Sequence, residues 1–318
     1  MFHVEHRARF FLFEHVPRGT CCSDMAATVV FVQIPGFIKV GEMARIIAVS
    51  NQKGGVGKTT TAVNLAACLA AAEKKVLLVD LDPQANAVSG LGFVSGEITE
   101  SMYNVLVDEL PIKGIILSTE LKCLDLAPAN QDLIGAEIEL VTAMGREVRL
   151  KDALQAVANQ YDFIVMDCPP ALGILTVNAL TAADSVLIPL QCEYYAMEGL
   201  SQLLKTIGLI KKRLNPGLER EGILLTMYDR RNNLSFQVEQ DIRGHFQAEV
   251  FTTVIPRNVK LSEAPSHGKP AILYDINSAG AQAYMDVASE LIKRIPATAL
   301  RTGGTVQPGR PQNIGGEL

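Results

Sequence analysis

A glycine-rich loop carries two lysines, Lys53 and Lys58, in close succession. The stretch "NQKGGVGKTTT" covers residues 51–61, and its second half matches the pattern G-x-x-x-x-G-K-[ST], with Lys53 in the place of the first glycine. Glycines let the backbone turn tightly, so that its NH groups and the positive end of the next helix point at phosphate oxygens. Lys58 is then placed to reach the β- and γ-phosphates of a nucleotide, and the Thr59 hydroxyl to ligate Mg²⁺. The alternative is a glycine loop that caps a helix without binding a ligand. The predicted nucleotide-binding residues of the loop are Lys53, Gly54, Gly55, Val56, Gly57, Lys58, Thr59 and Thr60.

Aspartates lie at the ends of two apolar runs. Asp80 stands in "LLVDLDPQAN", and Asp167 ends the apolar run of "DFIVMDCPPALG". A carboxylate at the end of a buried strand is well placed to bind Mg²⁺ directly or through water. We therefore predict metal ligands at Thr59, Asp80 and Asp167.

Composition limits the classes of protein to consider. The 318 residues are 48% hydrophobic and 20% charged, the balance of a soluble globular protein. The longest apolar runs fall short of the roughly 20 residues that cross a bilayer, and no signal pattern precedes them, so a cytoplasmic protein without a membrane partner is expected. The six cysteines form neither a C-x-x-C pair nor a metal-ligand spacing, which indicates reduced thiols. A net charge of −5 argues against a broad basic surface, so any DNA contact must come from a local patch.

Short apolar runs alternate with longer alanine- and leucine-rich segments from Arg45 onward. This alternation predicts an α/β fold, a doubly wound and mostly parallel sheet with helices on both faces. Strands are expected at "RIIAVS", "KVLLVD", "DFIVMD", "SVLIPL" and "GILLTM". Further helices are expected at about 132–143, 148–159, 174–183, 195–214, 234–246 and 278–295. One domain over residues 43–296 accounts for all of them, and residues 297–318, which lack a periodic apolar face, are expected to be disordered.

The loop sequence "KGGVGKTT" resembles the deviant Walker A motif of the ParA and MinD class of ATPases. The resemblance implies that Lys53 crosses a dimer interface to the phosphates bound by the other subunit, and that Asp82 orients the attacking water. Together with Lys58, these are the expected catalytic residues. A cation supplied by a partner stabilises the transferring phosphoryl group, and such groups are worth about 10³ to 10⁵ in rate. For Lys53 the alternative is a solvated loop lysine, and for Asp82 it is helix capping before Pro83, which does not exclude catalysis.

Other segments separate the members of that class. The stretches "LIPLQCEYYAMEGLSQLL", "LTMYDRRNNLS" and "VIPRNVKLSEAPSHGKP" resemble the chromosomal ParA or Soj group, and the resemblance covers nearly everything from Met43 to Ile295. It implies a chromosome-segregation ATPase that uses ATP and Mg²⁺, forms a homodimer with ATP, binds duplex DNA without sequence preference and responds to a ParB-type protein bound at parS. Such a protein is cytoplasmic and associated with the nucleoid. The alternative is a MinD-like membrane-associated regulator, which requires a C-terminal amphipathic helix that the residues after Ile295 do not provide.

The same resemblance points to a local basic patch. Arg231 in "MYDRRNN" and Arg257 in "IPRNVK" stand where family members carry arginines that bind DNA. Guanidinium and ammonium groups neutralise phosphates, which gives an affinity that falls with salt. The alternative, ordinary surface charges, is favoured by the acidic composition. Met227 and Pro256 are expected to flank the adenine. The implied DNA-binding residues are Arg230, Arg231, Arg257 and Lys260.

The first 42 residues precede Met43, where similar proteins begin. The segment "EHVPRGT" at residues 14–20 can be encoded by DNA that contains the palindrome TGTTCCACGTGGAACA, and "MFHVEH" at the start by DNA that contains TGTTTCACGTGGAACA. Both strings resemble parS, in different reading frames. We therefore hypothesise that residues 1–42 are a disordered or mis-annotated extension translated from intergenic DNA. The rival is a true N-terminal arm that binds a partner, and the N-terminal mass of the intact protein distinguishes the two.

Overall fold

The computed structural model describes residues 9–12, 30–33, 43–194 and 196–294. The predictions made for residues 297–318 and for most of residues 1–42 fall outside this part of the chain. Within the described residues, no helix is both long enough and apolar enough to cross a membrane.

A seven-stranded sheet forms the centre of the molecule, in the order β5-β6-β4-β7-β3-β8-β9. All neighbouring pairs are parallel except β5 with β6, which is antiparallel. The prediction of a mostly parallel α/β sheet is therefore confirmed. The strands are β3 (Arg45–Val49), β4 (Val76–Asp80), β5 (Leu117–Ser118), β6 (Leu124–Ala127), β7 (Phe163–Asp167), β8 (Ser185–Gln191) and β9 (Glu219–Thr226).

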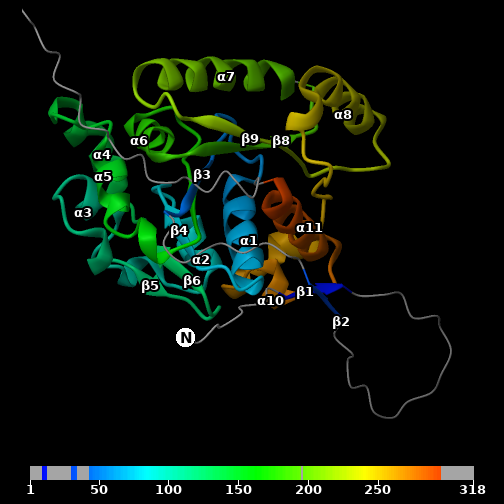
Figure 1. Ribbon diagram of the computed structural model, residues 1–318, viewed down its shortest axis with the longest axis horizontal. Helices are drawn as coiled ribbons and strands as arrows, with labels where there is room; N and C mark the ends of the chain where they lie inside the picture. Colours follow the sequence, from blue (N-terminus) through cyan, green and yellow to red (C-terminus); the bar gives the residue numbers. More distant parts are fainter. Residues whose placement is uncertain (1–8, 13–29, 34–42, 195, 295–318) are drawn as a thin grey trace, which may run out of the picture.

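Helices cover both faces of the sheet, as Figure 1 shows. On one face α1 packs against α11, and on the other α6 packs against both α5 and α7. The longer helices are α1 (Lys58–Ala71), α6 (Ile174–Ala182), α7 (Ala196–Arg213), α8 (Asn233–Phe246) and α11 (Ala279–Arg294). The shorter ones are α2 (Asn86–Gly90), α3 (Met102–Leu106), α4 (Leu133–Glu139), α5 (Arg149–Gln155), α9 (Val259–Glu263) and α10 (Ala271–Tyr274).

Burial on both faces explains the composition of the central strands. Every residue of β4 ("VLLVD") and of β7 ("FIVMD") is buried. Strands of this kind read as continuous apolar runs rather than as an alternation. The two exceptions to that pattern are the aspartates at the carboxyl ends, Asp80 and Asp167, so burial itself marks these two residues as unusual.

The strand order creates a natural ligand site at the end of β3. The chain leaves β3 through α1 toward β4 on one side, whereas β8 pairs with β3 on the other side. Ligands of open α/β sheets bind at such a reversal, beyond the carboxyl ends of the strands. The glycine-rich loop follows β3 directly and therefore lies at this position.

Some elements differ from the expectations. β5 and β6 were not predicted, because β5 has only two residues and β6 reads "LDLA", with a polar residue inside a run of four. Two short strands, β1 (Arg9–Leu12) and β2 (Val30–Gln33), pair antiparallel in a separate sheet. A lone two-stranded hairpin is marginally stable at best in water, so the hypothesis of an unselected N-terminal segment stays a prediction.

Candidate active site

Backbone conformation shapes the glycine-rich loop. Gly55 and Gly57 have φ values of 74° and 87°, in the left-handed region that residues with a side chain rarely adopt. Gly57 is also the residue that precedes the first turn of α1, so the tight turn delivers Lys58 and Thr59 to the helix N-terminus. The free NH groups of a helix N-terminus attract anions.

Two neighbouring strands hold this loop in place. The Asn51 side chain accepts a hydrogen bond from the Lys53 NH at 3.1 Å and donates one to the carbonyl of Pro189, a residue near the end of β8, at 2.7 Å. From the next strand along, the Thr226 hydroxyl at the end of β9 donates to the Val56 carbonyl at 2.9 Å. Neither Asn51 nor Thr226 was predicted as part of the site. The loop is thus preformed before a ligand arrives.

Lys58 is placed to meet a phosphate. Lys58 is only 7% exposed, and its Nζ donates to the Lys53 carbonyl at 3.1 Å. Burial lowers the pKa of Lys58, and the negative charges of Asp167 and Asp82 oppose that shift. A triphosphate would supply the further acceptors that an ammonium group with three donors requires.

Asp167 is a buried carboxylate at the carboxyl end of β7. Both of its side-chain oxygens are buried, and neither has a partner among the described residues. It pairs in register with Asp80 on the adjacent parallel strand, so the two side chains lie next to each other. Burial, and then the charge of Asp80, raise the pKa of Asp167 well above its ordinary value, and the nearby Thr59 hydroxyl opposes that shift. Such a group is expected to acquire a cation when the site is in use.

These residues fit a magnesium ion that is shared with phosphates. Asp167 offers oxygens, the ligands that Mg²⁺ prefers, and Thr59 stands at the first turn of α1 beside it. The part of the chain that the structure describes holds no group of three or more His, Cys, Asp or Glu side chains that could bind a metal on their own. Proteins commonly hold Mg²⁺ through one or two carboxylates together with substrate phosphates. The donor set therefore fits that mode, in which a bound nucleotide completes the coordination.

Asp80 makes a different set of contacts from those predicted. One of its oxygens accepts from the Asp82 NH at 3.0 Å, and the other accepts from the NH groups of Ala87 and Val88 at 3.1 and 3.3 Å. Burial raises the pKa of Asp80 to about 7, although these three NH groups oppose the shift. The geometry thus gives Asp80 the task of ordering the loop that carries Asp82 and of starting α2. Its role as a metal ligand stays a prediction.

Asp82 lies directly beyond β4 in a tight turn. Its Oδ1 accepts from the Gln84 NH at 3.0 Å, and its carbonyl accepts from the Ala85 NH at 2.9 Å. Ala85 has a φ of 51°, an unusual conformation for a residue with a side chain. Strained backbone of this kind occurs often at functional sites. The Asp82 side chain thus holds the turn that precedes α2, whereas the cap position of that helix is Ala85 and has no side-chain hydrogen bond. The catalytic role of Asp82 stays a prediction.

Lys53 lies at the surface of this single chain. Its Nζ forms an ion pair with Glu193, and the two side chains are 45% and 42% exposed. Exposed pairs of this kind contribute little to stability, about 0–1 kcal/mol. The amine is therefore only weakly held, and a stronger negative partner can draw it away from Glu193.

The two residues predicted to flank the adenine come together beyond the end of β9. Met227 follows β9 and has a φ of 50°. The next residue, Tyr228, donates its NH to the Ile255 carbonyl at 2.9 Å and accepts at its own carbonyl from the Arg257 NH at 3.0 Å. These bonds place Pro256 opposite Tyr228 and close to Met227.

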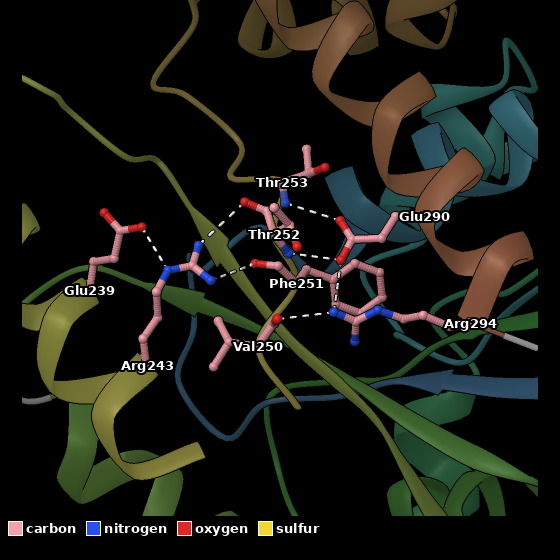
Figure 2. A network of polar contacts seen from close by, with 8 residues as sticks. All are labelled: Glu239, Arg243, Val250, Phe251, Thr252, Thr253, Glu290 and Arg294. Atoms are coloured by element: carbon pink, nitrogen blue, oxygen red, sulfur yellow. Dashed lines mark hydrogen bonds and ion pairs between the residues drawn. The ribbon is translucent and has the colours of Figure 1, made fainter. Parts of the chain in front are cut away.

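Side chains of α8 hold the segment that leads to Pro256. Figure 2 shows Arg243 between Glu239, with which it pairs at 2.8 Å, and the backbone of residues 250–253. Arg243 donates to the carbonyls of Phe251 and Thr252 at 3.1 and 3.3 Å. The NH groups of Phe251 and Ile255 donate to carbonyls of β9, so Arg243 adds side-chain bonds to a segment that already contacts the sheet.

Side chains of α11 hold the same segment from the opposite side in Figure 2. Glu290 accepts from the NH groups of Thr252 and Thr253 at 2.8 and 3.0 Å. Arg294 donates to the Val250 carbonyl at 2.9 Å and to Glu290 at 2.7 Å. The two helices thus fix the segment that connects α8 to Pro256.

The predicted DNA-binding residues divide into two groups. Arg230, Arg231 and Arg257 are exposed, and the backbone bonds between Tyr228 and Arg257 bring their segments together. The Arg231 side chain is 90% exposed and pairs with Asp229 at 3.1 Å. Lys260, in contrast, pairs with Glu263 at 2.9 Å and lies 5.4 Å from the centre of the Tyr274 ring. The exposed arginines are therefore better placed than the lysine to meet a phosphate backbone.

The site combines a glycine loop at the reversal of a parallel sheet, a lysine at a helix N-terminus and an unpaired aspartate on the neighbouring strand. These features together define a P-loop ATPase. A family model described as "AAA domain" matches residues 44–220. The chain is 59% identical to the chromosome partitioning protein ParA of Myxococcus xanthus, over 81% of this chain and 90% of that protein. It is also 59% identical to the sporulation initiation inhibitor protein Soj of Bacillus subtilis, over 78% and 98%. A crystal structure of cobyrinic acid a,c-diamide synthase from Mycobacterium smegmatis with bound ADP and magnesium is similar to the chain, with a TM-score of 0.70, 38% identity and coverage of 82% and 100%. The chain belongs to the ParA/Soj family of chromosome-partitioning ATPases.

The unpaired carboxylate makes a testable prediction for stability. Because the pKa of Asp167 is raised above its unfolded value of about 3.9, ionisation of this group costs stability at pH values above that, and the cost grows until the pH passes the folded pKa. Asp167→Asn is therefore expected to melt like the wild type near pH 4 and about 2–4 °C higher at neutral pH for each kcal/mol relieved, as measured by calorimetry without nucleotide.

Asp80→Asn is the matched control for that experiment. It removes the same charge, but an amide offers only one accepting atom where the Asp80 carboxylate accepts from three backbone NH groups. Burial raises the pKa of Asp80 as well, so removal of its charge also relieves a cost. We expect the weakened backbone bonds to outweigh that relief, so that this variant melts below the wild type at neutral pH. Equal melting temperatures for Asp167→Asn and the wild type across the pH range would show that the carboxylate has a partner in solution.

Proposed function

We propose that the chain is an ATP-driven switch that binds DNA as a dimer during chromosome partitioning. ATP with Mg²⁺ occupies the glycine-rich loop, and two copies meet face to face over the nucleotides. The dimer binds duplex DNA without sequence preference, and a ParB-type protein bound at parS stimulates hydrolysis and release. The single observation that carries the proposal is the preformed loop with its unpaired carboxylate, Asp167, on the same chain as exposed arginines beyond β9.

Three side chains and the backbone of the loop act on the phosphates in this proposal. The loop NH groups and Lys58 bind and orient the triphosphate, and Asp82 holds a water in line with the terminal phosphorus. Lys53 of each copy leaves Glu193 and places its charge on the nucleotide of the other copy. The water adds to the terminal phosphorus as the bond to the β-phosphate oxygen breaks, which yields ADP and phosphate. The magnesium supplies further charge stabilisation when bound. A related protein with bound ADP and magnesium supports this choice of cofactors.

The nucleotide and DNA sites share structural elements. Thr226 hydrogen-bonds the Val56 carbonyl within the loop and lies only a few residues before Arg230 and Arg231. ATP can favour DNA binding only if it stabilises the state that binds DNA better. The connection through the end of β9 supports such a coupling, because a shift of the loop and a shift of the arginines involve the same strand.

Arg231→Glu tests the DNA part of the proposal. The variant is expected to form the ATP-dependent dimer and to bind DNA about tenfold or more weakly at moderate salt, because a charge that attracts phosphates is replaced by one that repels them. The salt dependence should also become shallower, by about 0.9 in the slope of log K against log salt for each phosphate that is no longer neutralised. Binding of fluorescent duplex DNA of unrelated sequences over a salt series measures both quantities.

Lys212→Glu is the matched control, since it makes the same change of charge at the exposed C-terminal end of α7. It should bind DNA like the wild type. Wild-type DNA affinity in Arg231→Glu would place the DNA surface elsewhere. Binding of the wild type with ATP to anionic vesicles rather than to DNA would favour the membrane-associated alternative.

A further inference from the structure

An apolar ridge runs along the outer side of α4 and the residues that follow it. Two of its members, Ile134 and Ile138, are four residues apart in α4 and lie on one side of the helix, whereas Leu133, Ala136 and Leu140 are buried. The other two members follow the helix. Exposed apolar surface of this kind on a soluble domain marks an interaction site. The ridge consists of Ile134, Ile138, Val141 and Met144, which are 58%, 73%, 58% and 94% exposed.

The ridge lies beside the active site. α4 follows β6, whose carboxyl end is at the same edge of the sheet as those of β4 and β7, because the three strands are parallel. α4 contacts α6, and a side chain on Gly173, the residue before α6, would collide with the carboxylate of Glu137. Gly173 ends the short loop that begins at Asp167, and Leu172 in this loop is itself 37% exposed. The ridge therefore lies at the edge of the sheet that also carries the nucleotide loop.

We propose that a second copy of this chain covers the ridge in the ATP-bound dimer. This inference rests on the proposed function, in which two copies meet over their nucleotides. Contact at a twofold axis must be self-complementary, so that each surface fits its own copy. The ridge meets this condition, because it is apolar along its length, Asp132 precedes it and Arg146 follows it. An antiparallel pairing of two ridges brings each Asp132 toward the partner copy's basic end.

The charges at the two ends can take part in such a pairing. Arg146 pairs in the single chain with its neighbour Glu147 at 2.9 Å, and both side chains are partly exposed, at 37% and 33%. It also donates to the Val141 carbonyl, a bond that keeps it at the end of the ridge. Asp132 is exposed and accepts from the Asn130 amide at 2.7 Å. Exposed pairs exchange partners at little cost. A basic segment of another protein is the rival occupant, but it leaves the basic end of the ridge without a complement.

The division of work between the ridge and Lys53 follows from this placement. Lys53 in the single chain is paired with Glu193, so its site on the partner's nucleotide is incomplete until two copies associate. Burial of the ridge supplies the association, and Lys53 supplies the charge that reaches the phosphates. Loss of the ridge should therefore remove the dimer without weakening the binding of nucleotide to a single chain.

The test is Ile138→Asp in the full chain, examined by sedimentation velocity with Mg²⁺ and a hydrolysis-resistant ATP analogue. We expect self-association to weaken at least about 30-fold, the effect of losing an interface hot spot. Binding of the analogue at low protein concentration should match the wild type. The control Leu209→Asp places the same charge at an exposed apolar position on α7, where Leu209 is 56% exposed, and should leave the dimer unchanged. Ile138→Leu should dimerise like the wild type.

Each outcome decides between the occupants. Wild-type association of Ile138→Asp would overturn the inference and leave the proposed function standing. Normal association of Ile138→Asp together with loss of stimulation by a ParB-type protein would also overturn it, because the ridge would then be the partner's docking site. A wild-type chain that stays monomeric with the analogue would instead overturn the proposed dimer itself. Because Ile138 is exposed, an unchanged melting temperature is expected and shows that the variant is folded.

Discussion

Lys53→Ala is expected to lower stimulated ATP hydrolysis by about 10³-fold or more, while nucleotide binding to the single chain remains. A positive group supplied across an interface to a transferring phosphoryl group is worth about 10³ to 10⁵ in rate. In the structure, the Lys53 amine forms an exposed pair with Glu193, whereas the buried Lys58 stands at the start of α1. The two lysines are therefore expected to separate in function, one acting on the neighbour's nucleotide and the other on its own.

Two controls make this result specific. Lys58→Ala should lose nucleotide binding itself, because it removes the ammonium group from the start of α1. Glu193→Gln should dimerise and hydrolyse ATP at least as well as the wild type, since it only releases Lys53 from its partner in the same chain. Equilibrium binding of a fluorescent ATP analogue, sedimentation and single-turnover hydrolysis measure the three properties. An unchanged dimer and unchanged turnover in Lys53→Ala would make this residue an ordinary surface lysine.

Asp82→Ala is expected to hold ATP and to accumulate as a dimer bound to DNA. Loss of the group that orients the attacking water should reduce turnover by about 10²- to 10⁴-fold, the usual contribution of a positioned acid or base. The proposed phosphate contacts come from the loop and not from Asp82, so nucleotide affinity should remain. Co-sedimentation with DNA in the presence of ATP, followed by a chase with ADP, measures the trapped fraction.

Asp82→Asn separates a catalytic role of Asp82 from its hydrogen bond within the turn. The amide oxygen can accept from the Gln84 NH as the carboxylate does, so the turn before Ala85 is retained while the charge is lost. If Asp82 acts on the water, both variants lose turnover. If it only caps the turn, Asp82→Asn should hydrolyse ATP like the wild type, and Asp82→Ala should melt at a lower temperature.

The central sheet could be predicted because burial on both faces leaves a strong pattern. β4 and β7 are continuous apolar runs that end in aspartate, and the loop after β3 carries its own motif. Shorter elements at the edge carry no such pattern, since β6 has four residues and includes the polar Asp125. The strands that are buried on both faces could therefore be predicted from the sequence, and the short edge strands could not.

The contacts within the site were harder to predict. Asp80 was expected at a metal, yet its oxygens are engaged by the NH groups of three later residues, and a sequence does not show where those groups will point. The pairing of Lys53 with Glu193 joins residues 140 positions apart, and each stands in a motif that gave no hint of the other. Thr226 was missed for the same reason, because its bond to Val56 depends on how β9 passes the loop.

The segment between α8 and Pro256 has a mechanical consequence. Arg243 of α8 donates to carbonyls of this segment, and Glu290 of α11 accepts from its NH groups. The Arg294 guanidinium lies 4.0 Å from the centre of the Phe251 ring. Because two helices hold this segment, we expect it to move as a rigid unit rather than to bend internally. In the proposed complex, displacement of Pro256 by the adenine should therefore also displace Arg257, whose NH donates to the Tyr228 carbonyl, and the last turn of α8, which carries Arg243. The proposed base and DNA contacts are then expected to shift together.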